Sequence, residues 1–169
     1  QGGLISPILA NVYLHYVLDL WFEKSIKKQL YGEAYLVRFA DDFLIMFQYE
    51  RDAQRVYEAI IKRMELFGLE LSKEKTRILP FGRNCGTRET FDFLGFTHFN
   101  SKTRKGYYTV GHKISRKKKK QFKSNLKKWV KKNRDKQFDE FMKKLNKKLT
   151  GSFNYYSLSG MIREVRSLW

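Results

Sequence analysis

The sequence contains one cysteine and two prolines among its 169 residues. The single cysteine, Cys85, has no partner for an intramolecular disulfide, which argues against a small secreted scaffold and favours a reducing compartment. No run of about 18 uncharged apolar residues is present, so we expect no membrane span. Hydrophobic residues form 42% of the chain, enough for a packed core. We therefore expect a cytoplasmic protein, bacterial or nucleoid-associated, with an organelle as the alternative location.

Acidic residues are scarce in the last two fifths of the chain. Residues 1–100 contain 13 basic and 13 acidic residues, whereas residues 101–169 contain 22 basic and 4 acidic ones. The net charge of +18 therefore lies entirely in the second part. Such a step is typical of a neutral body followed by a module that binds a polyanion. We place the boundary near residues 100–115.

The spacing of apolar residues predicts an α/β (α+β) fold, with short strands between helices. We expect one helix from Pro7 to about Gln29, with Ser6 as its N-cap, and a second from an Asp52 cap to Gly68. The strand-like runs cover residues 35–39, 43–47, 69–71, 76–81, 90–99 and 106–114. Three further helices follow, each with one apolar face, and predict a small bundle.

Two adjacent carboxylates, Asp41 and Asp42, separate two strand-like apolar runs. This arrangement predicts a hairpin with acids at its tip. Neighbouring negative charges repel each other unless a cation neutralises them. Hard oxygen ligands select Mg²⁺, which is often shared with substrate phosphates. An ordinary acidic turn is the alternative interpretation of this dipeptide.

Five segments, taken in order, can be compared with known families. The first four are QGGLISPILANVYL (residues 1–14), FADD (39–42), GLELSKEKT (68–76) and FDFLGF (91–96), and the last combines LN (145–146) with GSFNYY (151–156). The FADD segment is similar to the Tyr-Ala-Asp-Asp box of reverse transcriptases. The whole set resembles the group II intron reverse transcriptase/maturase family. Each segment alone would be weak evidence, but together they span almost the entire chain.

The resemblance implies a fold and an activity. Residues 1–112 would form the C-terminal part of a right-hand polymerase palm with a central antiparallel hairpin. Residues 113–169 would form a truncated three-helix thumb, or maturase X domain. The implied activity is RNA-directed DNA polymerisation by two-metal nucleotidyl transfer, with two Mg²⁺ ions or, alternatively, Mn²⁺. The implied partners are an RNA template, intron RNA, a DNA primer and deoxynucleoside triphosphates.

The resemblance also assigns roles to single residues. Asp41 and Asp42 would bind the metals, and Lys75 would stabilise or protonate the leaving group. The residues that would contact nucleotide and template are Gln1, Gly2, Gly3, Phe39 and Ala40. The primer grip would consist of Leu94, Gly95 and Phe96. The cations that would bind nucleic acid are Lys117, Lys118, Lys119, Lys120, Lys123, Lys127, Lys128 and Lys131.

The family pattern includes parts that this sequence does not contain. A right-hand palm has a further catalytic aspartate on a strand upstream of the segment at Gln1. We expect the chain to be cut from a longer one, with that aspartate about 50 to 100 residues before Gln1. We also expect the chain to be inactive as a polymerase without it. Phe39 stands where the family has Tyr, which removes a hydroxyl beside the nucleotide pocket.

Two other functions stay open on the sequence. One is a non-catalytic RNA-binding remnant, in which the basic helices act and the acidic pair is vestigial. The other is a reverse transcriptase of a phage-defence, CRISPR or retron system. Residues 151–156 favour the intron type.

Overall fold

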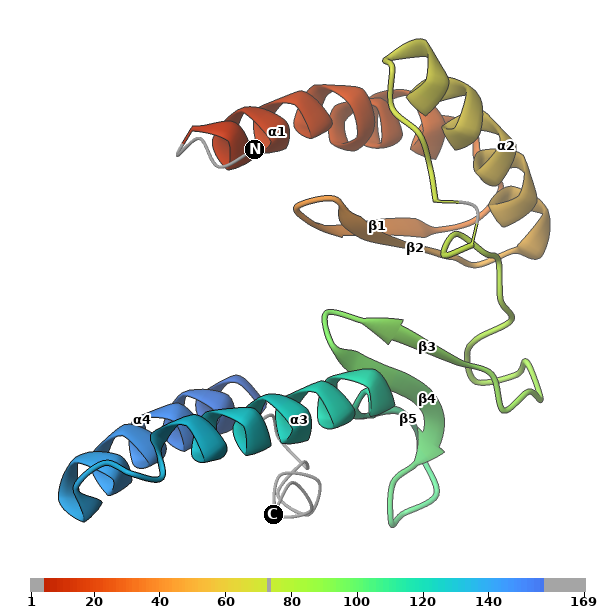
Figure 1. Ribbon diagram of the computed structural model, residues 1–169. Helices are drawn as coiled ribbons and strands as arrows, with labels where there is room; N and C mark the ends of the chain where they lie inside the picture. The colour runs from red at the N-terminus through yellow and green to blue at the C-terminus, as the bar shows by residue number, and fades with distance from the viewer. Residues whose placement is uncertain (1–4, 73, 157–169) are drawn as a thin grey trace. The chain divides into compact units, whose positions relative to one another are not determined.

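The computed structural model describes residues 5–72 and 74–156 (Figure 1). The chain divides into two compact units, Gln1–Pro80 and Phe81–Trp169. Within the described residues the strands form two antiparallel sheets, β1–β2 in the first unit and β3–β4–β5 in the second. The expected mixture of helices and strands is therefore confirmed. None of the described helices is long and apolar enough to cross a membrane.

The first unit begins with a continuous helical segment. It comprises α1 (Ser6–Leu14), two π-helical turns, η1 (His15–Asp19) and η2 (Phe22–Ile26), and a 3₁₀ turn, η3 (Lys27–Gln29). The predicted cap is wrong, because Ser6 already lies inside the helix and Ile5 occupies the N-cap without a side-chain hydrogen bond. The π turns contain the deepest core residues of this segment, Val17, Leu18 and Phe22.

The predicted hairpin follows as β1 (Ala34–Phe39) and β2 (Asp42–Phe47), with Phe39 paired to Asp42 at its tip. Helix α2 (Glu50–Leu66) comes next, and the helices lie on one side of the hairpin (Figure 1). The apolar face of α2 packs on the helical segment and the inner face of the hairpin, because Val56, Ile60 and Met64 recur at helical spacing. This packing leaves the hairpin tip at the edge of the core.

Asp52 is a buried residue and not the cap of α2. Helix α2 begins after Tyr49, and Asp52 lies in its first turn with only 1% of its surface exposed. Its Oδ2 accepts hydrogen bonds from the backbone N–H groups of Tyr31 and Gly32, both at 3.0 Å. The carboxylate therefore holds the loop that leads into β1, and the predicted cap is wrong.

The segments 69–71 and 76–81 are not strands, contrary to the prediction. They form an irregular connection after α2. Leu69 and Leu71 pack against the core of the first unit. Their apolar character therefore reflects packing onto helices and not pairing within a sheet.

The second unit begins with a three-stranded sheet, β3 (Thr90–Phe93), β4 (Phe96–Lys102) and β5 (Tyr108–Ile114). The local apolar pattern predicted one strand over residues 90–99, whereas the family resemblance implied a hairpin tip at Leu94 and Gly95. The structure has a hairpin there, because Leu94 and Gly95 form a two-residue turn between Phe93 and Phe96. Phe96 and Ile114 are buried and pack with Phe122 and Tyr156 from the helices that follow.

Two helices complete the described part of the second unit, α3 (Arg116–Asn133) and α4 (Phe138–Tyr156). They run side by side (Figure 1), and the rings of Trp129 and Phe141 lie 5.4 Å apart. The predicted third helix is not separate at its start, because α4 continues through Gly151 to Tyr156. The remainder of that predicted helix lies outside the described residues.

Candidate active site and nucleic-acid interface

The acidic turn, residues 39–42, joins β1 to β2. Ala40 and Asp41 are its two central residues, and both Asp41 and Asp42 are exposed. Ala40 has a φ of 54°, a left-handed conformation that costs a residue with a Cβ roughly 1–2 kcal/mol. Residues held in such conformations concentrate at functional sites, where the surrounding structure maintains them. The geometry of this turn is therefore imposed by its surroundings.

Arg38 connects the turn to its surroundings, with one hydrogen bond to the turn and three to α1 and η1. Its Nε and Nη2 donate to Oδ1 and Oδ2 of Asp19, each at 2.7 Å, in a bidentate pair. Its Nη1 donates to Oδ1 of Asn11 at 2.8 Å and to the carbonyl oxygen of Ala40 at 2.9 Å. One guanidinium thus ties the strained turn to α1 and η1. We call these residues, Arg38, Asp19 and Asn11, the Arg38 clamp.

The Arg38 clamp is locally neutral. The side chain of Arg38 is 12% exposed and that of Asp19 is 25% exposed. The hydrogen bond from Arg38 lowers the pKa of Asp19, and the same bond raises the pKa of Arg38. Because Arg38 is already paired with Asp19, it leaves the charges of Asp41 and Asp42 free to act on a ligand.

Sequence reasoning missed the clamp, although a signal for it was present. The alternation along β1 places Arg38 on the same face as Ala34 and Leu36, which pack against the core. A charged residue at such a position requires a partner. Both carboxylate oxygens of Asp19 provide this partner by accepting hydrogen bonds from Arg38.

The carboxylates of the acidic turn fit Mg²⁺ in chemical type. Exposed carboxylate oxygens are hard ligands that can share an ion with water and phosphate oxygens. Within residues 5–72 and 74–156, no group of three or more His, Cys, Asp or Glu residues is arranged to hold a metal. Asp41 and Asp42 would therefore be the only carboxylate donors that the described chain places at this turn.

Other predicted site residues of the first unit are less constrained. Lys75 is exposed in a turn, where the backbone N–H groups of Lys75 and Thr76 donate to the Ser72 carbonyl at 3.0 and 2.9 Å. Phe39 is 64% exposed beside the acidic turn. The predicted nucleotide contacts Gln1, Gly2 and Gly3 lie outside the described residues.

A second strained turn is found at the predicted primer grip, in the other unit. Leu94 and Gly95 have φ values of 50° and 84°. Positive φ at both central residues defines a type I′ turn, which normally selects Asn-Gly. In the described chain, Ala40 and Leu94 are the two residues other than glycine with positive φ, and each lies at the tip of a hairpin predicted to be functional.

The turn at Leu94 is anchored to both helices of its unit. The Tyr155 hydroxyl donates to the Leu94 carbonyl at 3.1 Å, and the Ser115 N–H donates to the Gly95 carbonyl at 3.0 Å. A Cβ on Gly95 would lie 3.5 Å from Cγ of Lys118. Phe96, the third predicted grip residue, is only 8% exposed and acts as the core anchor of the hairpin.

Replacing Leu94 by Asn tests whether the side chain or the turn matters. Asn tolerates the left-handed conformation, so Leu94→Asn should stabilise the chain by about 1 kcal/mol in urea unfolding. If the leucine side chain contacts the primer, the same variant of the intact protein should bind primer more weakly. Leu94→Ala is the control, since it removes the side chain but keeps the strain. Unchanged primer binding in both variants would exclude Leu94 from the grip.

Helix α3 presents a nearly continuous basic surface. Ser115 caps the helix, with its Oγ accepting from the Lys118 N–H at 3.4 Å. The exposed predicted lysines are Lys117, Lys118, Lys120, Lys123, Lys127, Lys128 and Lys131, and Lys119 is half-buried. The first turn of α3 contains no acidic residue. Its cations are therefore repelled by the partial positive charge at the N-terminus of the helix. A polyanion would relieve this repulsion.

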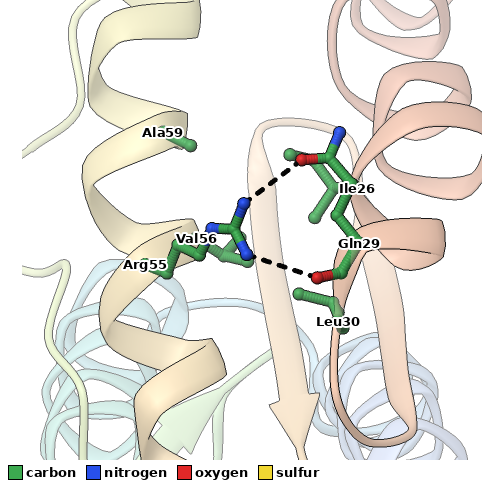
Figure 2. A pocket seen from close by; sticks show the side chains of 6 residues that line it. All are labelled: Ile26, Gln29, Leu30, Arg55, Val56 and Ala59. Atoms are coloured by element: carbon green, nitrogen blue, oxygen red, sulfur yellow. Dashed lines mark hydrogen bonds between the residues drawn. The ribbon is translucent and has the colours of Figure 1, made fainter.

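The pocket shown in Figure 2 is lined by none of the predicted site residues. It is a crease of about 200 Å³ between η2, η3 and α2, lined by Ile26, Gln29, Leu30, Arg55, Val56 and Ala59. The Arg55 guanidinium donates to the backbone oxygen and Oε1 of Gln29 at 3.3 and 3.4 Å. Its charged group is already used in joining two helices, so the crease provides no catalytic group.

Two family models match successive parts of the chain. Residues 1–98 match the model for reverse transcriptase (RNA-dependent DNA polymerase). Since this match covers more than half of the chain, the chain belongs to the reverse transcriptase family. Residues 119–169 match the group II intron, maturase-specific domain, so the protein is a member of the group II intron reverse transcriptase/maturase family. No match is found among the curated proteins.

Proposed function

We propose that this chain supplies the acidic turn and the basic thumb of an RNA-directed DNA polymerase of the group II intron type. In this proposal residues 1–112 belong to the palm and residues 113–169 to the thumb, or X domain. The observation that carries the proposal is the acidic turn itself. Two exposed carboxylates follow a strained alanine whose carbonyl is clamped by Arg38. A turn selected only for connecting two strands would favour Gly or Asn at that position.

The chemistry follows from the positions of the charged groups. Asp41 and Asp42 would hold two Mg²⁺ ions, which when bound supply the charge for activating a primer 3′-hydroxyl and stabilising the leaving pyrophosphate. The Arg38 clamp would fix the direction of the Asp41 carboxylate before substrate binds. Lys75 would stabilise or protonate the leaving group. Phe39 and Ala40 would contact the nucleotide.

The nucleic-acid partners would be bound by the second unit. The exposed lysines of α3 would contact phosphates of the template–primer duplex and of structured intron RNA. Leu94 and Gly95 would contact the primer backbone near its 3′ end. The position of the Leu94-Gly95 turn supports this assignment, because a Cβ on Gly95 would lie 3.5 Å from Cγ of Lys118 in the first turn of α3.

The proposal is tested by template-directed synthesis in the longest natural reading frame that contains these residues. The intact protein should extend a DNA primer on an RNA template in the presence of Mg²⁺ and stop when the metal is chelated. An intact, folded protein that binds RNA but never extends a primer would instead support a non-catalytic RNA-binding remnant.

Charge reversal at the start of α3 tests the basic surface. Replacing Lys117, Lys118, Lys119 and Lys120 by Glu should weaken RNA binding and lower the salt dependence of the binding constant. If roughly six lysines contact phosphates, log K should fall with log salt at a slope near −5 in the wild type, and about four fewer contacts should reduce the slope by roughly 3. Titrations at several salt concentrations measure both slopes. A slope that does not change would contradict the thumb assignment.

A matched control uses lysines of the first unit. Reversing Lys24 and Lys28, which lie on the opening helical segment, changes net charge without touching α3. This control should leave the salt slope nearly unchanged. A loss about half that of the α3 variant would mean that net charge alone drives binding, because the control reverses two lysines and the α3 variant reverses four.

A further inference from the structure

The turn between β4 and β5 carries a basic and aromatic surface that the proposed function does not use. We call residues 102–107 the β4–β5 tip. Its charged residues are Lys102, Arg104 and Lys105, and every residue of the tip is exposed. Tyr107 is 66% exposed, among the most exposed large side chains of the described chain. A large aromatic ring left in water beside three cations is a candidate contact surface.

The β4–β5 tip is ordered by its own hydrogen bonds. The Thr103 N–H donates to the Tyr107 carbonyl at 2.8 Å, and the Gly106 N–H donates to the Thr103 carbonyl at 2.9 Å. The Tyr107 N–H also donates to Oγ1 of Thr103 at 3.1 Å. Gly106 has a φ of 84°, which permits the tight reversal. The tip therefore presents Tyr107 from a preorganised turn, which lowers the entropy lost on binding.

The neighbouring tyrosine has a different role. Tyr108 is half-buried, and its hydroxyl donates to Oδ1 of Asn100 at 2.9 Å. Burial raises the pKa of Tyr108. The two tyrosines are adjacent in the sequence, but Tyr108 is part of the fold and Tyr107 is left available to a ligand.

The charge of the tip is not balanced by nearby acids in the sequence. Residues 93–134 contain no Asp or Glu. Among the ion pairs of the described residues, none involves Lys102, Arg104 or Lys105. Three cations within four positions repel one another at low salt. A polyanion would relieve this repulsion.

We propose that the β4–β5 tip binds an unpaired segment of RNA, with Tyr107 stacked on a base and its three cations on the flanking phosphates. The combination favours unpaired RNA because a base must leave a helix to expose its face to an aromatic ring. An acidic protein would engage the cations but would not explain the exposed ring. This inference rests on the proposed RNA binding and adds a second contact outside α3.

The test uses the 169-residue chain itself and an oligouridine of roughly 16 nucleotides as probe. Tyr107→Ser should weaken binding by roughly tenfold and leave the salt slope unchanged, because a stacked ring is uncharged. Tyr107→Phe should bind like the wild type, since it keeps the ring. Tyr108→Phe is the matched control and should also bind like the wild type.

The cations are tested separately from the ring. The triple variant Lys102→Gln, Arg104→Gln, Lys105→Gln should lower the salt slope by about 2, as expected for three contacts to a single strand. Circular dichroism and urea unfolding should show an unchanged fold, because all three side chains are exposed. A blunt RNA duplex should bind Tyr107→Ser as well as it binds the wild type.

Several results would overturn this inference. If Tyr107→Ser binds oligouridine within twofold of the wild type, the proposed stacking of Tyr107 on a base is wrong. If the triple variant has the same salt slope as the wild type, the proposed contacts between the three cations and phosphates are wrong. A loss seen with single-stranded DNA but not with RNA, or an equal loss with duplex RNA, would contradict the assigned ligand.

The outcome can be separated from that of the proposed function. If the wild type binds no RNA, both proposals fail. If charge reversal on α3 flattens the slope while the tip variants change nothing, only the tip inference fails. If the tip variants weaken binding while the α3 variant does not, the tip inference stands and the thumb assignment fails.

Discussion

Asp41→Asn should reduce Mg²⁺-dependent primer extension by the intact protein about a thousandfold or more, on the order of 4 kcal/mol in the activation barrier. The substitution keeps the size of the side chain and removes the charge that would hold a divalent cation. Asp41 is exposed, so the fold should be unaffected. RNA binding should also stay nearly unchanged, because the proposed phosphate contacts lie in the other unit. Single-turnover extension and RNA titration, measured on the same preparation, check both statements.

A matched acid elsewhere in the unit provides the control. Glu50→Gln removes a carboxylate from the start of α2 and should leave extension within about twofold of the wild type. Extension by Asp41→Asn at the wild-type rate would contradict the metal assignment. Loss of RNA binding in Asp41→Asn would show that the substitution acts through the fold and not through catalysis.

Arg38→Lys should lower the rate of extension by about a hundredfold while changing the Michaelis constant for the nucleotide little. Lysine keeps the positive charge but cannot form the bidentate pair with Asp19 and at the same time hold the Ala40 carbonyl. The acidic turn would then lose the contact that maintains its left-handed alanine. A displacement of about 1 Å at a reacting group is enough for an effect of this size. Arg38 thus acts as a positioning residue, which is why the rate constant should change and nucleotide binding should not.

Arg63→Lys is the control for the Arg38 clamp. Nε of Arg63 donates to the Val17 carbonyl at 3.1 Å, so this arginine also joins two parts of the first unit, but it does not contact the acidic turn. The control should lower stability without lowering the rate of extension. Equal rate losses in both variants would mean that Arg38 supports only the fold.

The clamp also predicts a dependence of stability on pH. The pKa of Asp19 is below its ordinary value of 3.8 because Arg38 donates hydrogen bonds to it. The stabilisation from this pair is therefore present above about pH 4 and is lost as the pH falls through the lowered pKa. Arg38→Met removes the bidentate partner of Asp19, which keeps its contact with Nδ1 of His15 at 3.3 Å, and should cost roughly 2–3 kcal/mol at pH 7. Urea unfolding at several pH values should show a smaller loss below pH 4 in Arg38→Met than in the wild type.

Local patterns were sufficient for much of the fold. The alternation and the paired acids located the hairpin of β1 and β2, and the helical spacing located α2 and α3. These predictions succeeded because the spacing of apolar residues along the chain indicates which face of a helix or strand is buried. The resemblance to the maturase family also came from ordered segments of sequence, and the family models agree with it.

Other features depended on contacts between distant residues. Residues 69–71 look like a strand locally, but they pack on helices as an irregular segment. Leu94-Gly95 lies inside an apolar run that looks like one strand locally; the family resemblance implied a hairpin tip there, and the pairing of Phe93 with Phe96 shows the turn. Asp52 was expected to cap its helix but instead binds Tyr31 and Gly32, about 20 positions earlier in the chain. The propensities of neighbouring residues cannot predict contacts with residues so far away in the chain.

Residue types and their order were enough to identify the family, the excess of positive charge near the C-terminus and the acidic pair between two strands. The tertiary structure decided which polar groups are already satisfied and which are available. Arg38 is paired with Asp19 and Tyr108 with Asn100, whereas Tyr107 is exposed at the end of a turn. The physical reason is that a hydrogen bond depends on the distance between two atoms, and folding sets that distance for residues far apart in the chain.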